Sequence, residues 1–193
     1  CASYELVFHD QTEVAFCGKN SAVLKMMRET LNTSYYHISL TNDVLGLESA
    51  VALKNAYALG VALTIGLVNR HLGADAGLHY NSQAAAFYQA VKEMRRLLAI
   101  QGATFDCENI GIGDLYVTVY GGRTRKIGIL LGEGKSYEEA MNILSGVTLE
   151  SLVVARRVAK AVYRKAELGQ VSLADFPMMC HSYDVLENGK DAE

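Results

Sequence analysis

The chain has 193 residues, half of them apolar, and a formal net charge of −3. This length suits one good-sized domain with room for a small appendage. The near-neutral charge and the lack of a Lys/Arg-rich run exclude an ordinary nucleic-acid-binding protein. The four cysteines form no C-x-x-C pair, which argues against a zinc site or a disulfide framework and fits a reducing, cytoplasmic compartment. Because Cys1 opens the sequence in mid-pattern, we interpret the chain as a piece of a longer protein.

Residues 1–42 differ in pattern from the rest of the chain. Thr12–Cys17 is a short apolar run rich in β-forming residues, 20–32 is amphipathic with a helical period, and 35–40 is again β-rich. Strand, helix and strand in this order predict a βαβ unit. Two strands do not make a stable domain, so we expect these residues to be the tail of a larger α/β sheet.

A long helix is predicted from Asp43 to Arg70, with Asp43 as its N-cap. Apolar residues cover almost its whole circumference, so it should be buried on most sides. Lys54 is the only formal charge between Glu48 and Arg70. Such a lysine pairs with a carboxylate, reaches a cleft, or lays its stem on apolar surface with its head in water. We reject a membrane span because Lys54 and Asn55 interrupt the run and no basic cluster flanks it.

The remaining pattern predicts a mainly α protein. In the helix expected at 81–101, Glu93 is predicted to lie on the solvated side, beside Arg95 and Arg96. Local propensity alone makes 109–114 a turn and 115–120 a strand. Helices are expected at 81–101, 123–131, 137–144, 150–168 and 176–186, the fourth of these ending at Gly169 and the last opened by Pro177.

Three clusters carry candidate chemistry. The first is Lys54 with Asn55. The second is the glycine-rich 111–115 with Thr118 after it, where Asp114 serves either as the partner of a desolvated lysine or as a helix cap. The third is 121–126, where two glycines, three cations and a hydroxyl at a helix start form either an anion site or a solvated basic turn.

Neither a P-loop nor a G-x-G-x-x-G turn in a βαβ setting occurs in the sequence. The five histidines show no metal-ligand spacing and no nucleophile partner, so we expect core or surface histidines and no metal site.

The segments LESAVALKNAYAL, GIGDLYVTVYGGRTRK and GEGKSYEEA and the Phe176-Pro177 tail resemble NAD(P)-dependent glycerol-3-phosphate dehydrogenases, in order and with few gaps from about Ala2 to Leu186. The resemblance implies a Rossmann cofactor domain followed by a helical domain like that of 6-phosphogluconate dehydrogenase. Residues 1–42 would be the tail of the first, and 43–193 the helical substrate and dimerisation domain. It also implies that 115–120 is helical, against local propensity.

The resemblance implies roles for single residues. Lys54 matches the family's proton-transfer lysine, Asp114 and Thr118 the residues that hold this lysine and the substrate hydroxyls, and Asn55 the lysine's neighbour. Arg123, with Thr124 beside it, matches the arginine that binds the substrate phosphate and approaches the cofactor. The loop holding Thr148 and Glu150 would contact the nicotinamide side of the cofactor.

The implied reaction is reversible hydride transfer between NAD or NADP and dihydroxyacetone phosphate, a small phosphorylated substrate. We expect a homodimer in which the cofactor is bound mainly by a domain outside this sequence, so that this chain alone is inactive. The choice between NAD and NADP stays open. Two alternatives also stay open: a helical dimerisation module without turnover, and a dehydrogenase for another small hydroxy-substrate.

Four positions depart from the family's usual pattern. Relatives usually have glycine in place of Val51 and lysine in place of Gln83. They usually have asparagine in place of Thr124 and glycine in place of Ser151. Val51 lies three residues before Lys54, on nearly the same helix face, so its bulk is expected to narrow the pocket.

Overall fold

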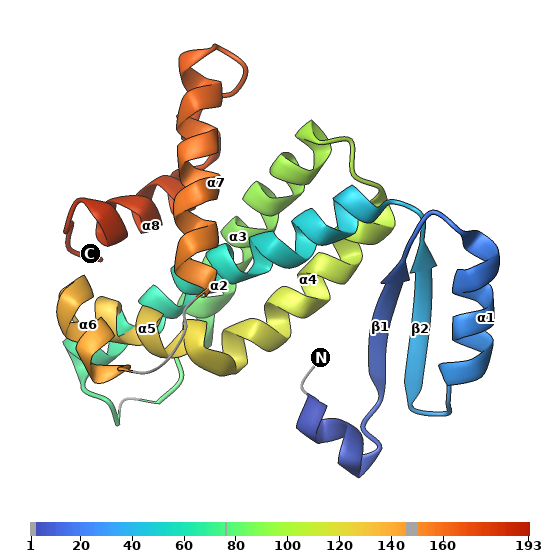
Figure 1. The fold of residues 1–193 in the computed structure, drawn as a ribbon. Helices are drawn as coiled ribbons and strands as arrows, with labels where there is room; N and C mark the ends of the chain where they lie inside the picture. Colours follow the sequence, from blue (N-terminus) through green and yellow to red (C-terminus); the bar gives the residue numbers. More distant parts are fainter. Residues whose placement is uncertain (1–2, 76, 146–149) are drawn as a thin grey trace.

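We describe the protein with a computed structural model, which describes residues 3–75, 77–145 and 150–193. Figure 1 shows a helical body with a pair of strands at one end, so the prediction of a mainly α fold is confirmed. After a short 3-10 helix, Ser3–Phe8, the elements are β1 Thr12–Cys17, α1 Ser21–Leu31, β2 Tyr36–Thr41, α2 Val44–Leu72, α3 Tyr80–Ile100, α4 Phe105–Tyr120, α5 Gly122–Gly132, α6 Tyr137–Ile143, α7 Glu150–Glu167, a 3-10 turn Leu173–Asp175 and α8 Pro177–Glu187.

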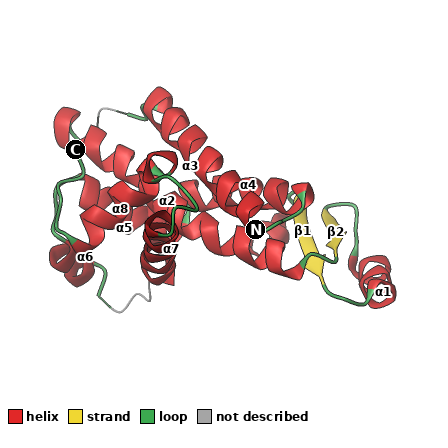
Figure 2. Cartoon of the chain, turned by 90° about the horizontal axis from the view of Figure 1, so that it is seen from above, coloured by secondary structure: helices red, strands yellow, loops and turns green. Residues whose placement is uncertain are grey.

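The predicted strand, helix and strand are confirmed at the N-terminal end. β1 and β2 pair in parallel, with Thr12 opposite Tyr36 and Cys17 opposite Thr41. Asn20 caps α1 by accepting the backbone N–H groups of Ala22 and Val23. Seen from above in Figure 2, these strands and α1 lie together at one end of the molecule, and the helical body forms the rest.

Helix α2 is the core of the helical body, as its all-round apolar pattern predicts (Figure 1). It has 29 residues, and α3, α4, α5, α7 and α8 all pack against it. By length and composition it passes as a membrane span, with a mean hydropathy of 1.6, but 61% of that window is buried inside the protein. Such burial is what a core helix requires.

Small residues allow α2 and α5 to pack closely. A Cβ added to Gly66 would lie 2.7 Å from the Cα of Gly132, and one added to Gly128 would lie 3.0 Å from the carbonyl oxygen of Leu59. Any larger side chain at these positions would force the two helices apart. The second half of α5 is therefore held closely against α2, the helix that carries Lys54.

Local propensity gave the wrong structure for residues 109–120. Neither the turn at 109–114 nor the strand at 115–120 exists, because both lie inside helix α4, as the family resemblance implied. The apolar stripe of α4, which includes Gly111, Leu115 and Val119, is buried against the core. This tertiary burial outweighs the modest preference of Val117, Thr118 and Val119 for strands.

The prediction of a solvated Glu93 is also wrong. Its side chain is 0% exposed. One carboxylate oxygen accepts the backbone N–H of Met178 at 2.7 Å, and the other accepts that of Met179 at 3.0 Å. Both donors lie in the first turn of α8, whose own N-cap residue Phe176 makes no side-chain capping bond. Glu93 therefore caps α8 from α3.

Candidate active site

Lys54 and Asp114 meet where α2 and α4 lie side by side. The ammonium of Lys54 donates a hydrogen bond to Oδ2 of Asp114, and the two form a salt bridge. Their side chains are 17% and 18% exposed, so the pair is mostly enclosed but still open to solvent on one side. Of the alternatives for Lys54, pairing with a carboxylate is the one realised, and Asp114 is not a helix cap.

The neighbouring predicted site residues share this corner of the structure. Thr118 lies one helical turn after Asp114, and its hydroxyl donates to the Asp114 backbone carbonyl at 2.7 Å. Asn55 directly follows Lys54 in α2 and is half-buried. Lys54, Asn55, Asp114 and Thr118 thus supply an ammonium, an amide, a carboxylate and a hydroxyl within two packed helices. Such groups suit proton transfer and the binding of hydroxyl or carbonyl oxygens.

A cleft of about 970 Å³ lies between the strands and the helical body. Strand-side lining includes Glu13, Arg28 and Ser39. The helical side is formed by Leu47, Val51, Asp106, Asn109, Ile110, Gly113, Asp114 and Val117. Asp114 joins this cleft to the salt bridge with Lys54. The volume is at the upper end of the range for small-molecule sites.

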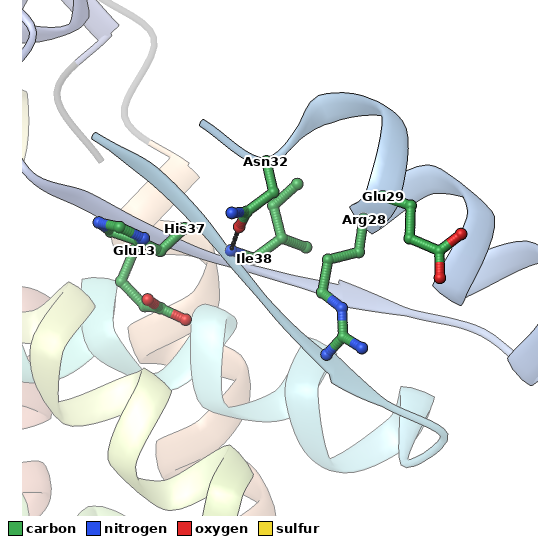
Figure 3. A pocket seen from close by; sticks show the side chains of 6 residues that line it. All are labelled: Glu13, Arg28, Glu29, Asn32, His37 and Ile38. Atoms are coloured by element: carbon green, nitrogen blue, oxygen red, sulfur yellow. Dashed lines mark hydrogen bonds between the residues drawn. The ribbon is translucent and has the colours of Figure 1, made fainter. Parts of the chain in front are cut away.

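A smaller hollow of about 490 Å³ lies over the strands and α1 (Figure 3). It is lined by Glu13, Arg28, Glu29, Asn32, His37 and Ile38. Asn32 is committed to the fold there, because its side-chain oxygen accepts the backbone N–H of Ile38 at 3.1 Å. The hollow shares Glu13, Arg28 and Ile38 with the larger cleft, so it extends that cleft away from Lys54.

The predicted anion segment opens α5 directly after α4 ends. Gly122 has φ of 85°, a left-handed conformation that glycine adopts without strain, and this turns the chain into α5. Arg123 is exposed in the first turn, whereas Thr124 is only 7% exposed. Arg125 donates to the carbonyl of Val119 at 3.3 Å, at the end of α4. Arg123 and Lys126 are therefore the exposed cations of this segment, with Arg123 in the first turn of the helix, and Arg125 serves the fold.

Comparison with known families decides the family of this chain. The family described as NAD-dependent glycerol-3-phosphate dehydrogenase C-terminus matches residues 43–193. The chain belongs to this family.

Similar proteins agree with this assignment. The chain is 32% identical over 188 residues to an NADP(+)-dependent glycerol-3-phosphate dehydrogenase of Archaeoglobus fulgidus, an alignment covering 94% of the chain and 52% of that protein. It is 33% identical to a glycerol-3-phosphate dehydrogenase [NAD(P)+] of Leuconostoc mesenteroides, covering 94% of the chain and 50% of that protein. The chain spans about half the length of the curated relatives it matches.

Solved structures of glycerol-3-phosphate dehydrogenases share the fold. The enzyme of Coxiella burnetii superposes with a TM-score of 0.77 at 24% identity, covering 97% of this chain and 54% of that one. That of Plasmodium falciparum gives a TM-score of 0.78 at 20% identity, covering all of this chain and 52% of that one.

The resemblance to glycerol-3-phosphate dehydrogenases also singled out two predicted cofactor contacts and several departures from the family pattern. Thr148 lies outside the described residues, and Glu150 opens α7 but its side chain is not described. Val51 is 37% exposed and lines the cleft, while the narrowing expected from its bulk stays a prediction. Gln83 and Ser151 are 5% and 4% exposed, and within the described residues neither Oε1 of Gln83 nor Oγ of Ser151 has a hydrogen-bond partner. Two of the four departures thus bury a polar oxygen in the helical body.

The sequence reasoning missed most of the helical wall of the cleft. Asp106, Asn109, Ile110 and Val117, outside the predicted clusters, recur at helical spacing on one face of α4 with Gly113 and Asp114. Reading 105–120 as a helix would have revealed that face. Among residues 3–75, 77–145 and 150–193, no group of three or more His, Cys, Asp or Glu side chains is arranged to hold a metal ion.

Proposed function

We propose that this chain supplies the substrate-binding and catalytic part of an enzyme that reversibly reduces dihydroxyacetone phosphate to glycerol 3-phosphate with NADH or NADPH. The observation that carries the proposal is the Lys54–Asp114 pair at the edge of the cleft, in a chain of the glycerol-3-phosphate dehydrogenase family. An ion pair between two core helices costs desolvation free energy, and a shielded lysine beside an accessible cleft is a typical proton donor.

In reduction, the Lys54 ammonium donates its proton to the carbonyl oxygen of the substrate, and in oxidation the neutral amine takes the hydroxyl proton back. Asp114 orients the Lys54 side chain and stabilises its charged form through the hydrogen bond between them. A bound nicotinamide supplies the hydride chemistry. With a nicotinamide bound, its hydride would go to the carbonyl carbon while Lys54 protonates the carbonyl oxygen, so that atoms and charge balance.

We assign substrate contacts to polar groups on three helices. Asn55 and Thr118 hold the oxygens of the substrate near the reacting carbon, while Arg123 binds the phosphate together with the N–H groups at the start of α5. Thr124, beside Arg123, is also assigned to the phosphate, although it is only 7% exposed. Arg123, Thr148 and Glu150 are assigned to the nicotinamide side of the cofactor.

The residues that line the cleft fit one edge of a nicotinamide cofactor. Leu47, Val51 and Val117 offer apolar surface for a flat ring, and its carboxamide would find hydrogen-bonding partners such as Asn109. We assign the rest of the cofactor site to the Rossmann domain of which residues 1–42 form the tail. The whole enzyme is proposed to act as a homodimer in the cytoplasm.

A second candidate is a dehydrogenase for another small hydroxy-substrate. The departures at Val51 and Thr124 favour it, because Val51 places more bulk than a glycine in the cleft lining and Thr124 has no amide to offer at the phosphate segment. A helical module without turnover is the third.

The test is the loss of reduced-nicotinamide absorbance with the full-length protein, cofactor domain included, in which dihydroxyacetone phosphate is compared with dihydroxyacetone and with small 2-oxo acids. The proposal expects the phosphorylated ketone to have the highest kcat/KM. A preference for another carbonyl compound supports the second candidate, and no turnover of any supports the third.

A further inference from the structure

A single carboxylate joins the starts of the two helices that carry the Lys54–Asp114 pair. Oδ1 of Asp43 accepts the backbone N–H of Gly46, in the first turn of α2, at 2.8 Å. Oδ2 accepts the backbone N–H of Thr104, the N-cap residue of α4, also at 2.8 Å. The thiol of Cys107, in the first turn of α4, lies 3.6 Å from the same Oδ2. Asp43 therefore holds α4 as well as α2.

The contacts further along show that α2 and α4 run in the same direction from this point. Ala50, seven residues after Asp43, packs so closely on Gly111, seven residues after Thr104, that a Cβ on Gly111 would lie 2.9 Å from the Ala50 Cβ. Lys54 lies eleven residues after Asp43, and Asp114 lies ten residues after Thr104. At a rise of about 1.5 Å per residue, Lys54 and Asp114 lie roughly 16 and 15 Å along their helices from the contact between Asp43 and Thr104.

We propose that Asp43 is a positioning residue for the reaction. By binding the starts of both helices, it fixes the position of α4 along the axis of α2 and so brings the Asp114 carboxylate to the Lys54 ammonium. The inference rests on the function proposed above. Asp43 itself does not touch the substrate. It acts through the register of two rigid helices, in which a shift of one residue would move Asp114 along the axis by about 1.5 Å.

The chemistry of Asp43 exceeds what an N-cap needs. An ordinary cap uses one side-chain oxygen, and asparagine caps a helix about as well as aspartate. Here the second oxygen is used on the other helix. The N–H of Thr104 and then that of Gly46 lower the pKa of the Asp43 carboxyl, as two charge-assisted bonds to one carboxylate should.

Two variants break the link from opposite sides. Asp43→Asn keeps an oxygen for Gly46 but turns an amide N–H toward the Thr104 N–H. Thr104→Pro removes the Thr104 N–H and leaves Asp43 intact, and the φ of −74° at Thr104 already suits proline. Thr104→Val is the matched control, because it removes the hydroxyl that contacts Cys107 but keeps the N–H. Ser136→Ala is a control that removes a helix cap far along the chain, on α6.

The first readout needs no turnover. The side-chain ¹⁵Nζ resonance of Lys54, assigned with Lys54→Arg, reports the pairing with Asp114. We expect this resonance to shift in Asp43→Asn and in Thr104→Pro, and to stay in place in Thr104→Val and Ser136→Ala. An unmoved Lys54 resonance in both link-breaking variants would overturn the inference.

The second readout is kinetic and is made in the active protein. Misplacement of a catalytic group by about 1 Å can cost on the order of a hundredfold in rate, so we expect kcat to fall about tenfold or more in both variants, with KM within about twofold. In an Asp114→Asn background the Asp43→Asn change should add no further loss. A full, multiplicative loss in that background would contradict positioning through Asp114. If the wild-type protein does not reduce dihydroxyacetone phosphate, the proposed function fails, whereas the Lys54 resonance still decides the inference.

Discussion

The Lys54–Asp114 pair lies between α2 and α4, and Glu93 lies between α3 and α8, so the helical body holds charged groups in two different settings. The pair opens onto a cleft and keeps 17–18% of its side-chain surface. Glu93 has no exposed surface and is bound by two backbone N–H groups of α8 and by the amide of Gln89 at 2.7 Å. The Lys54–Asp114 pair remains accessible to a small molecule, whereas the Glu93 carboxyl group is enclosed by hydrogen-bond donors of the protein itself.

The difference separates a chemical role from a structural one. A carboxylate surrounded by helix N–H groups stabilises the packing of α8 but has no route to a substrate. A lysine with one carboxylate partner at a cleft edge can exchange a proton with a ligand. Substitutions at the two sites should therefore affect different quantities, turnover at one and the free energy of unfolding at the other.

The largest expected effect is on turnover at Lys54. Lys54→Met keeps the apolar stem and removes the proposed proton donor, so kcat should fall by roughly two to four decades while the melting temperature changes little. Steady-state kinetics beside a thermal melt measure the two quantities. Lys92→Met, at an exposed position on α3, is the control and should leave both unchanged. A kcat of Lys54→Met within a few-fold of wild type would show that Lys54 has no chemical role in turnover.

The next effect is on stability at Glu93. Glu93→Ala leaves the buried N–H groups of Met178 and Met179 without an acceptor, which should lower the free energy of unfolding by about 2–5 kcal/mol. Urea unfolding measures the loss, with Glu48→Ala, exposed on α2, as the control. Turnover per folded molecule should stay close to wild type. A stable Glu93→Ala protein with lost turnover would reverse the roles of the two sites.

Arg123 and Arg125 repeat the comparison on a smaller scale within one helix. Arg123→Ala should cost roughly 1.5–3 kcal/mol, the scale of a hydrogen bond to a charged group. This corresponds to about a ten- to hundredfold loss in kcat/KM. Arg125→Ala loses the bond to the Val119 carbonyl and should lower the melting temperature slightly with little kinetic effect. Equal kinetic effects of both would support a solvated basic turn.

The smallest effect is the pH dependence of stability through Glu93. Burial raises the pKa of its carboxyl above the usual 4.5, although the Gln89, Met178 and Met179 donors oppose this. The folded state therefore binds the proton more tightly than the unfolded state, so this contribution to stability is complete below pH 4.5 and is lost as the pH rises through the folded pKa. The stability of the wild type relative to Glu93→Gln should decrease with rising pH over that window. A constant difference would show that Glu93 does not titrate there.

The sequence alone predicted the elements whose pattern is set by local chemistry. The apolar run of α2, the Ser136 capping box of α6 and Pro177 at the start of α8 all appear where the residues indicate. Lys54 was found because a lone charge in an apolar helix needs a partner. That Asp114 is this partner followed from the family resemblance and from its place in a glycine-rich segment, not from spacing.

What the sequence missed depends on contacts between distant segments. Helix α4 was misread because Gly111 allows close packing on α2, a role that local propensity does not register. Glu93 follows Ala86 and Ala90 at helical spacing and precedes Leu97, so the period placed it on the buried face, but its charge argued for water. Its partners lie 85 residues away on α8. The link from Asp43 to Thr104 likewise spans 61 residues and leaves no local signal.

The most direct test of the central claim is a double-mutant cycle between Lys54 and Asp114, read as kcat for the reduction of dihydroxyacetone phosphate. If the pair acts as one unit, Lys54→Met combined with Asp114→Asn should be no slower than Lys54→Met alone, because Asp114 serves only through the lysine. Losses that multiply in the double variant would contradict the claim and would give the two residues separate roles.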